Sequence, residues 1–212
     1  MGALEYAMIT LYTFATPNGH KASILFEELG LAYRARSVSL IRGEHKTPEF
    51  LKISPLGRIP AAVETLADGR EARLFGSGAI MLHYALREGR LLPDNPEQRL
   101  ESLNWFEMAI SDLGPAAVNL FRFTVRAPEK LPYAIEMFSS EVKRCYEAIE
   151  ARLGQTEYLA GTSYSIADIA CFPFVAASAV AHPGWLDGLI NLKRWHDALA
   201  ARPAVARGMA VP

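Results

Sequence analysis

The sequence predicts an α/β domain followed by an all-helical domain, and two observations lead to this prediction. Between residues 8 and 89, runs rich in β-branched and aromatic residues alternate with helical apolar patterns in the order β-α-β-α-β-β-α. After the proline-rich stretch 91–96, no alternating strand pattern follows. We therefore expect a mixed four-stranded sheet within residues 1–90, a linker at residues 91–96 and a helical domain in residues 97–212.

The first predicted strand, residues 8–14, is followed by a predicted helix that ends at Gly30. The turn Thr16-Pro17-Asn18-Gly19-His20-Lys21 joins them. Thr16 is a favourable N-cap residue, and Pro17 suits the first helical position, where no N–H is needed. The turn is therefore predicted to form the N-terminus of the first helix.

A helix that begins in this way offers a site for an anion. Its free amides near Asn18 point outward from the positive end of the helix dipole, and the Thr16 hydroxyl and the Asn18 carboxamide add donors. The site suits an anionic sulfur, a phosphate or a carboxylate. The alternative is that the turn only caps a helix, which is the common role of such residues. His20 and Lys21 follow on the first helical turns and are expected to be solvated.

A second strand is predicted in residues 31–40, because polar and apolar residues alternate there as in a half-buried strand. The strand-helix-strand order predicts that it runs parallel to the first strand. A polar loop at residues 42–46 then leads to a short helix, which Thr47 caps with Pro48 at its first position and which ends near Ser54.

An antiparallel hairpin and a third helix complete the predicted sheet. Residues 61–66 and 71–75 read as strands, and Asp68-Gly69 supplies the turn between them. Pro60 is tolerated at the start of its strand because no ladder hydrogen bond is required there. The third helix is predicted to run from Ser77 to Gly89.

Beyond the linker, apolar residues recur at spacings of three and four, which predicts helices. The expected helices are residues 97–123, bent at Gly114-Pro115, residues 131–153, a helix that starts at Ser165, and residues 191–202. Ser165-Ile166-Ala167-Asp168 resembles a capping box, and the apolar residues that follow predict the core of this domain. The residues from Pro203 onward are expected to be loose.

The composition of the chain limits the classes of function that are expected. A formal net charge of −1 gives no electrostatic reason to expect binding to nucleic acid or to an anionic membrane. The apolar run at residues 169–181 is too short to cross a bilayer. The two cysteines, Cys145 and Cys171, lie in helical patterns without a Cys-x-x-Cys partner, and the histidines lack metal-ligand spacing. We therefore expect no metal, no disulfide scaffold and a reducing, cytoplasmic location.

The order of elements and four motifs resemble the cytosolic glutathione transferases over essentially the whole chain. The motifs are the turn at residues 16–21, Ile53-Ser54-Pro55 with Ile59-Pro60, Tyr133-Ala134-Ile135-Glu136, and Ser165-Ile166-Ala167-Asp168-Ile169-Ala170-Cys171. Within that superfamily they are most similar to the bacterial nu class, the disulfide-bond reductase-like glutathione transferases.

The resemblance implies that the first domain is thioredoxin-like and binds glutathione as a co-substrate. Thr16 and Asn18 match the residues that face the glutathione sulfur. Ile59 matches the residue that offers its backbone N–H and C=O to the cysteinyl group, and Pro60 is implied to be cis. His45, Lys46 and Arg58 lie in the loops that hold the glycine carboxylate in related enzymes, and Ser77 matches the ligand of the γ-glutamyl carboxylate.

One departure from the family concerns Gly76, where the family usually has a glutamate whose carboxylate contacts the γ-glutamyl ammonium. Losing a charge-assisted hydrogen bond weakens binding by about 1.5–3 kcal/mol, which is about ten- to a hundredfold. An acid from a partner subunit is an alternative source of this contact, because the resemblance implies a homodimer. The second-substrate pocket is expected to be lined by Phe14, Phe121, Arg122 and Phe123.

The sequence thus predicts a glutathione-dependent transferase or disulfide-bond reductase that acts on a small electrophile or a disulfide. The alternative is a non-catalytic binding or regulatory protein with this fold, which Gly76 favours and the intact Thr16 and Asn18 disfavour. Tyr12 could act as the activating hydroxyl, although its position inside the strand favours a core role. Cys171 is expected to serve as a small hydrophobe rather than as a redox group.

Overall fold

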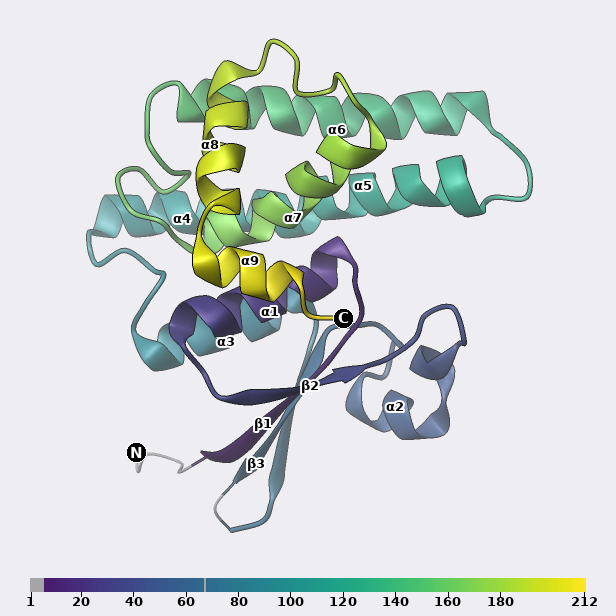
Figure 1. Ribbon diagram of the computed structural model, residues 1–212, viewed down its shortest axis with the longest axis vertical. Coiled ribbons are helices and arrows are strands. Elements are labelled where there is room, and N and C mark those ends of the chain that lie inside the picture. Colours follow the sequence, from purple (N-terminus) through teal and green to yellow (C-terminus); the bar gives the residue numbers. More distant parts are fainter. Residues whose placement is uncertain (1–5, 67) are drawn as a thin grey trace. The chain divides into compact units, whose positions relative to one another are not determined.

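The computed structural model describes residues 6–66 and 68–212, which form two compact units (Figure 1). The first unit extends to Arg90 and also includes Arg202–Pro212, whereas the second comprises Leu91–Ala201. The predicted division at residues 1–90, 91–96 and 97–212 differs from this at the C-terminus. There the final residues pack with the sheet and its helices instead of with the helical unit.

The sheet of the first unit contains β1 (Tyr6–Thr13), β2 (Tyr33–Ser37), β3 (Ala61–Leu66) and β4 (Glu71–Phe75). Their order is β2-β1-β3-β4. β1 pairs in parallel with β2, and the β1–β3 and β3–β4 pairs are antiparallel. The predicted mixed four-stranded sheet and its strand directions are therefore confirmed.

Three helices and a short turn connect these strands, and a fourth helix follows at the C-terminus. They are α1 (Pro17–Leu29), the 3-10 turn η1 (Glu44–Lys46), α2 (Pro48–Ile53), α3 (Ser77–Glu88) and α9 (Pro203–Met209). α1 begins and ends as predicted, because the Thr16 side chain caps its N-terminus and Gly30 adopts a left-handed conformation at its C-terminus.

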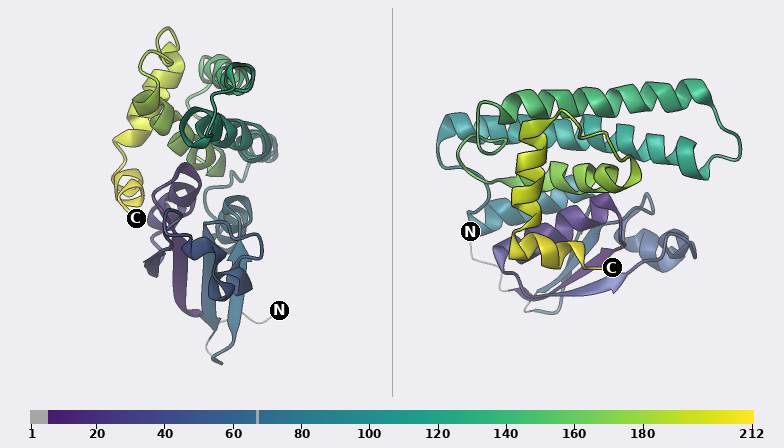
Figure 2. Two further views of the ribbon diagram at one scale, coloured as in Figure 1. Left: turned by 90° about the vertical axis from the view of Figure 1, so that its right-hand side faces the viewer. Right: turned by 45° about the horizontal axis from the view of Figure 1, so that its top comes forward.

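Three expectations for this unit were wrong. β2 is an outer strand, so its side chains from Arg34 to Ser37 are exposed instead of alternating between core and solvent. His20 and Lys21 are buried, with 9% and 1% of their surface exposed, respectively. The C-terminal residues form helix α9 instead of a loose tail, and α9 lies against α1 in both views of Figure 2. The burial of His20 and the formation of α9 are connected, because α9 covers the face of α1 that carries His20.

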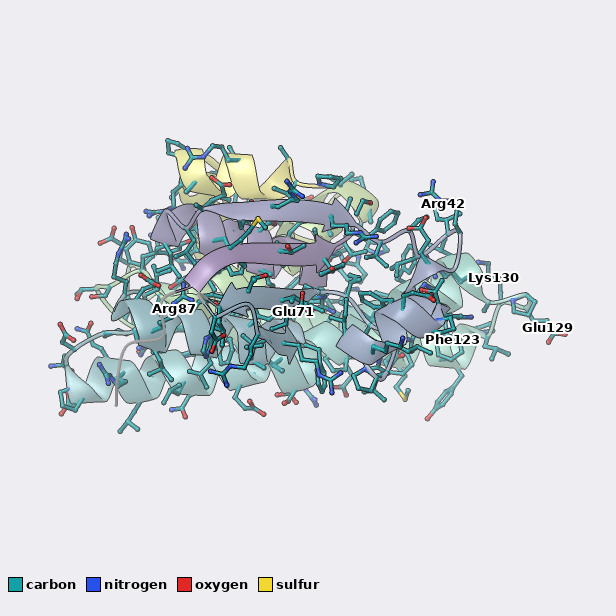
Figure 3. The ribbon with its side chains drawn as sticks, turned by 90° about the horizontal axis from the view of Figure 1, so that it is seen from below. Arg42, Glu71, Arg87, Phe123, Glu129 and Lys130 are labelled. Atoms are coloured by element: carbon teal, nitrogen blue, oxygen red, sulfur yellow. The ribbon has the colours of Figure 1, made fainter. Side chains whose placement is uncertain are left out.

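The core of the first unit lies between the sheet and helices α1 and α3. Leu11 of β1, Ile24 and Phe26 of α1 and Tyr84 of α3 are fully buried, and the rings of Phe26 and Tyr84 meet edge-on at 4.6 Å. The buried Glu64 of β3 pairs at 2.5 Å with Arg87 of α3, which is labelled in Figure 3. Aromatic packing and an ion pair thus both hold α3 on the sheet.

The second unit is entirely helical in its regular elements. It contains α4 (Pro96–Met108), the π-helical turn η2 (Ala109–Leu113), α5 (Gly114–Phe121), the π-helical turn η3 (Arg122–Arg126), α6 (Pro132–Leu153), α7 (Ile166–Ala181) and α8 (Ile190–Ala200). At the predicted bend, Gly114-Pro115, the structure has the π-helical turn η2 directly before Gly114. Pro115 lacks an N–H for the carbonyl four residues earlier, so the preceding turn widens.

Asp168 anchors the start of α7, which is the buried helix predicted for this unit. Its carboxylate accepts hydrogen bonds from the backbone N–H of Ser165 at 2.9 Å, from that of Leu159 at 3.0 Å and from the indole of Trp195 at 2.9 Å. The predicted capping box is therefore confirmed. Burial raises the pKa of Asp168, while these donors act in the opposite direction and favour the carboxylate.

Replacing Asp168 by alanine should lower the free energy of unfolding by at least about 2 kcal/mol, because three buried donors lose their acceptor. Urea unfolding followed by circular dichroism measures the change. The exposed Asp197→Ala is the control and should change stability by no more than about 0.5 kcal/mol. Equal losses for the two variants would contradict this account of the α7 cap.

Candidate functional site

Strand register brings four connecting segments to one edge of the sheet. Thr13 of β1 pairs with Ser37 of β2, and Tyr12 pairs with Ala61 at the beginning of β3. Ala61 in turn pairs with Phe75, the last residue of β4. The turn after β1, the loop after β2, the segment before β3 and the turn after β4 therefore meet there. These segments carry the predicted glutathione ligands.

At the turn after β1, the side chain of Thr16 is occupied within the chain. Its Oγ accepts the N–H of Gly19 at 3.2 Å and donates to the carbonyl of Phe14 at 3.3 Å, while its carbonyl accepts the N–H of His20 at 2.9 Å. Pro17 has no N–H. In the first turn of α1, the amide that finds no acceptor among the described residues is therefore that of Asn18, whose side chain is half-buried.

Gly19 permits this turn to form. A Cβ at this position would lie 2.2 Å from the carbonyl oxygen of Phe14 and 2.6 Å from Oγ1 of Thr13. No side chain fits there, so the helix begins directly against the end of β1.

The segment before β3 contains a residue whose backbone polar groups are not hydrogen-bonded in the described structure. The Ile59–Pro60 bond is cis, as the resemblance implies. The carbonyl of Pro60 accepts the N–H of Gly76 at 3.1 Å, which ties the start of β3 to the turn after β4. The backbone N–H and C=O of the half-buried Ile59 find no hydrogen-bond partner within residues 6–66 and 68–212.

The loops that carry His45, Lys46 and Arg58 pack on each other. A Cβ on Gly57 would lie 2.6 Å from the carbonyl oxygen of His45, and the hydroxyl of Ser54 donates to the carbonyl of Arg58 at 2.8 Å. Nδ1 of His45 is buried and unpartnered in the described structure. Lys46 and Arg58 are exposed, and neither forms an ion pair with a described carboxylate.

The neighbouring Arg42, labelled in Figure 3, differs from these cations because Glu44 neutralises it at 2.9 Å. The N–H of Ser39 donates to the same carboxylate at 2.7 Å, and together these donors lower the pKa of Glu44. Glu44 is thus engaged by Arg42 and Ser39, and no carboxylate among the described residues pairs with Lys46 or Arg58.

The turn after β4 presents a second helix N-terminus. Gly76 precedes α3 with a φ of 89° and provides no capping side chain. Its carbonyl accepts the N–H of Ile80 at 3.1 Å, so the amides of Ser77 to Ala79 precede the first helical hydrogen bond. Space is open around Gly76, with no heavy atom within 4 Å of the position of a Cβ. An anion at this end would meet both the dipole and the hydroxyl of Ser77.

The residues predicted to line the second-substrate pocket belong to different units. Phe14 follows β1 in the first unit, whereas Phe121, Arg122 and Phe123 lie in the second, at the end of α5 and in η3. Phe121 is 47% exposed, and Phe123, labelled in Figure 3, stacks on Phe138 at 5.7 Å. The shared pocket stays a prediction.

The alternative chemical groups have structural roles. Tyr12 packs on Phe50 at 6.1 Å and lies under the guanidinium of Arg36. Cys145 and Cys171 are buried, and burial raises the pKa of the Cys145 thiol to about 11, far from that of a reactive thiolate. Within residues 6–66 and 68–212, no group of three or more potential metal ligands gathers, and no helix is long and apolar enough to span a membrane.

The sequence did not indicate the surroundings of His20, which lies one turn beyond Thr16 and whose imidazole bonds the carbonyl of Gly208. A weak signal was available, because His20, Ser23 and Ile24 share one helix face at spacings of three and four. That face could not be recognised as buried without knowledge of α9.

A thioredoxin-like sheet unit with open helix ends, followed by a helical unit, defines the class of protein. Residues 7–85 match the family model described as "Glutathione S-transferase, N-terminal domain", and residues 132–198 match "Glutathione S-transferase, C-terminal domain". The chain belongs to the glutathione S-transferase family.

Individual relatives cover nearly the whole chain. The disulfide-bond oxidoreductase YfcG of Escherichia coli (strain K12) is 40% identical over 210 residues, which are 95% of this chain and 94% of that protein. A glutathione transferase family member from Pseudomonas fluorescens pf-5, solved with two glutathione bound, is 34% identical with a TM-score of 0.88 over 97% of this chain and 93% of its own. A glutathione transferase from Pseudomonas putida, solved with one glutathione disulfide per subunit, is 32% identical with a TM-score of 0.88 over 97% and 92%.

The capping role of Thr16 can be separated from any role in binding. Thr16→Ala should lower the free energy of unfolding by about 1 kcal/mol because the Gly19 amide loses its acceptor, and Thr16→Ser should retain the cap. Asn18→Ala should leave stability within about 0.5 kcal/mol of the original protein, since the Asn18 side chain makes no cap. Chemical denaturation tests the series, and a loss for Asn18→Ala as large as for Thr16→Ala would be inconsistent with this description.

Proposed function

We propose that this protein is a glutathione-dependent transferase and disulfide-bond reductase of the nu class. It holds the sulfur of glutathione as a thiolate at the N-terminus of α1, between Thr16 and Asn18. The observation that carries the proposal is the backbone N–H of Asn18, which has no acceptor among the described residues, whereas the other N–H groups of the first turn are hydrogen-bonded. The donation from Thr16 to Phe14 is long, 3.3 Å, so the hydroxyl proton could be given to an anion instead while the oxygen still accepts the Gly19 N–H.

The remaining ligands follow from the open groups at the same edge of the sheet. The free N–H and C=O of Ile59 would bind the cysteinyl backbone of glutathione in the manner of an added strand, next to Pro60. Ser77 and the uncapped end of α3 would bind the γ-glutamyl carboxylate. His45, Lys46 and Arg58 would bind the glycine carboxylate. In support, Lys46 and Arg58 have no ion-pair partner among the described residues, because the nearby Glu44 pairs with Arg42.

The energy required to ionise the sulfur is within reach of this site. A free thiol titrates near pH 8.5, and lowering that pKa by about two units requires about 2.7 kcal/mol of preference for the thiolate. A helix end contributes up to about 2 kcal/mol in a partly buried site, and one or two donors supply the rest. Neither a metal nor a protein thiol is needed.

Disulfide reduction would then depend on glutathione itself. Cys145 and Cys171 are the chain's cysteines and both are buried, so neither thiol is accessible to a substrate disulfide. The bound glutathione thiolate attacks one sulfur of the substrate disulfide, forming a mixed disulfide and releasing the other sulfur as a thiolate. A second glutathione thiolate then attacks the mixed disulfide, which yields glutathione disulfide and the second product thiol. The name of the relative YfcG and the bound forms in the two Pseudomonas structures support this route.

The proposal includes the wider setting of the enzyme. The family resemblance supports a homodimer, and cysteines that are buried and not joined in a disulfide favour the reducing cytoplasm. Phe14, Phe121, Arg122 and Phe123 are proposed to bound the site for the electrophile or disulfide.

Replacing Thr16 and Asn18 together by alanine should reduce turnover at least tenfold, because the thiolate loses its side-chain donors. Steady-state rates with a chlorinated aromatic and with a glutathionyl disulfide measure the effect. Thr16→Ser in the otherwise native chain is the matched control, since it retains the hydroxyl and the cap. Unchanged rates in the double variant would refute the assignment of these residues.

Gly76→Glu should increase the affinity for reduced glutathione about ten- to a hundredfold, because it adds an acid where the family has one and where space is open. Gly76→Gln is the control, since both side chains carry the same backbone cost of about 1–3 kcal/mol at this positive φ but only glutamate carries charge. Isothermal calorimetry measures both variants. Equal affinities of the two variants would show that the missing carboxylate does not limit glutathione binding. If the original protein gave no heat at millimolar glutathione, the non-catalytic alternative would be favoured.

A further inference from the structure

Helix α9 contacts α1 at backbone distance. A Cβ on Gly208 would lie 2.5 Å from Cα of Ile24 and 2.6 Å from its nitrogen, so glycine is required for the two helices to touch. The hydroxyl of Ser23 donates to the carbonyl of Gly208 at 2.7 Å. Figures 1 and 2 show the two helices side by side, although more than 170 residues separate them in the chain.

Ion pairs from α9 and from Arg202, the residue before it, add to this contact with the C-terminal half of α1. Arg202 binds both carboxylate oxygens of Glu28, at 2.7 and 2.9 Å. Arg207 binds Glu27 at 2.6 Å, and the hydroxyl of Tyr33 donates to the same carboxylate at 2.9 Å. Bidentate and shared contacts of this kind give the helix pair a defined register.

His20 connects this helix pair to the turn that forms the proposed sulfur site. Its imidazole bonds the Gly208 carbonyl, and its Nδ1 is buried and unpartnered in the described structure, so the bond is made by a protonated Nε2. Burial lowers the pKa of His20 and keeps the ring neutral. Its own N–H donates to the carbonyl of Thr16 at 2.9 Å. A continuous path thus runs from α9 through His20 to the cap residue.

We propose that His20 is a positioning residue for the sulfur site: its bond to the carbonyl of Gly208 holds the first turn of α1 in the orientation that directs the Asn18 amide at the thiolate. The inference rests on the proposed function. It makes α9 part of the site's support, although no residue of α9 is required to touch glutathione. The ligands of the two carboxylates lie in other segments and do not depend on this bond.

The alternative role of His20 is simple packing between two helices, and the choice of variants separates the two. His20→Leu retains an apolar side chain of related size but has no donor for Gly208. His20→Gln places an amide N–H near the position of Nε2 and does not titrate. Ser23→Ala removes the other bond to the same carbonyl. The Ser23 hydroxyl donates to the carbonyls of Gly208 and His20 and not to the cap residue, so this variant controls for loosening of α9 as such.

The test is the titration of the thiol of bound glutathione, followed by the ultraviolet absorbance of the thiolate, together with the calorimetric Kd of glutathione. In His20→Leu the pKa of the bound thiol should rise by about one unit. At a pH below the thiol pKa of both proteins, the variant should then hold about tenfold less thiolate, while its Kd for glutathione should stay within about threefold of that of the original protein. In His20→Gln the thiol pKa should lie close to that of the original protein, and in Ser23→Ala it should be unchanged. If His20→Leu does not fold, His20→Asn replaces it, because its amide is too short to reach Gly208.

Three results would overturn the inference. One is a folded His20→Leu protein whose thiol pKa equals that of the original protein, and another is an equal shift in the Leu and Gln variants, which would indicate packing alone. If the original protein binds glutathione without forming a thiolate near neutral pH, the proposed function fails as well. The unchanged behaviour of the variants alone would leave the proposed function standing.

Discussion

The pairing of β1 with both of its neighbours is the constraint on which the first unit depends. Because Thr13 lies opposite Ser37 and Tyr12 lies opposite Ala61, the connections that follow β1 and β2 and precede β3 reach the same edge of the sheet. A shift of one residue would turn buried side chains such as Leu11 toward solvent, so the core stabilises this register strongly. Backbone hydrogen bonding therefore places groups together that are more than 40 residues apart in sequence.

The groups gathered at that edge are suited to an anionic peptide because the chain leaves them unpaired. Two helices begin there, and each leaves backbone amides without an internal acceptor, near Asn18 in one case and near Ser77 in the other. Lys46 and Arg58 also have no ion-pair partner in the described part of the chain, whereas the nearby Arg42 pairs with Glu44. Glutathione has two carboxylates and an ionisable sulfur, and these open donors match that pattern of charge.

The buried polar residues of the two units stabilise helix starts in different ways. Asp168 is surrounded by donors from its own capping turn, a preceding loop and Trp195, so it specifies how α7 begins within the helical unit. His20 makes fewer contacts and leaves Nδ1 unpaired, which costs free energy in a buried position. His20 carries this cost and its N–H bonds the cap residue Thr16, which makes it a candidate for a functional role.

Local chemistry by itself determined the order of the elements up to residue 200 and the capping residues, whereas the family was indicated by the resemblance of four motifs. Thr16 with Pro17, Thr47 with Pro48 and the Ser165–Asp168 box act on their own backbone within a few residues, so their effect is readable from sequence. Only tertiary structure decided that β2 lies at the edge, that Pro203–Met209 forms a helix over His20, and that Lys21 is buried. The physical reason is that burial depends on partners distant in the chain, and a single sequence does not state which partner covers which face.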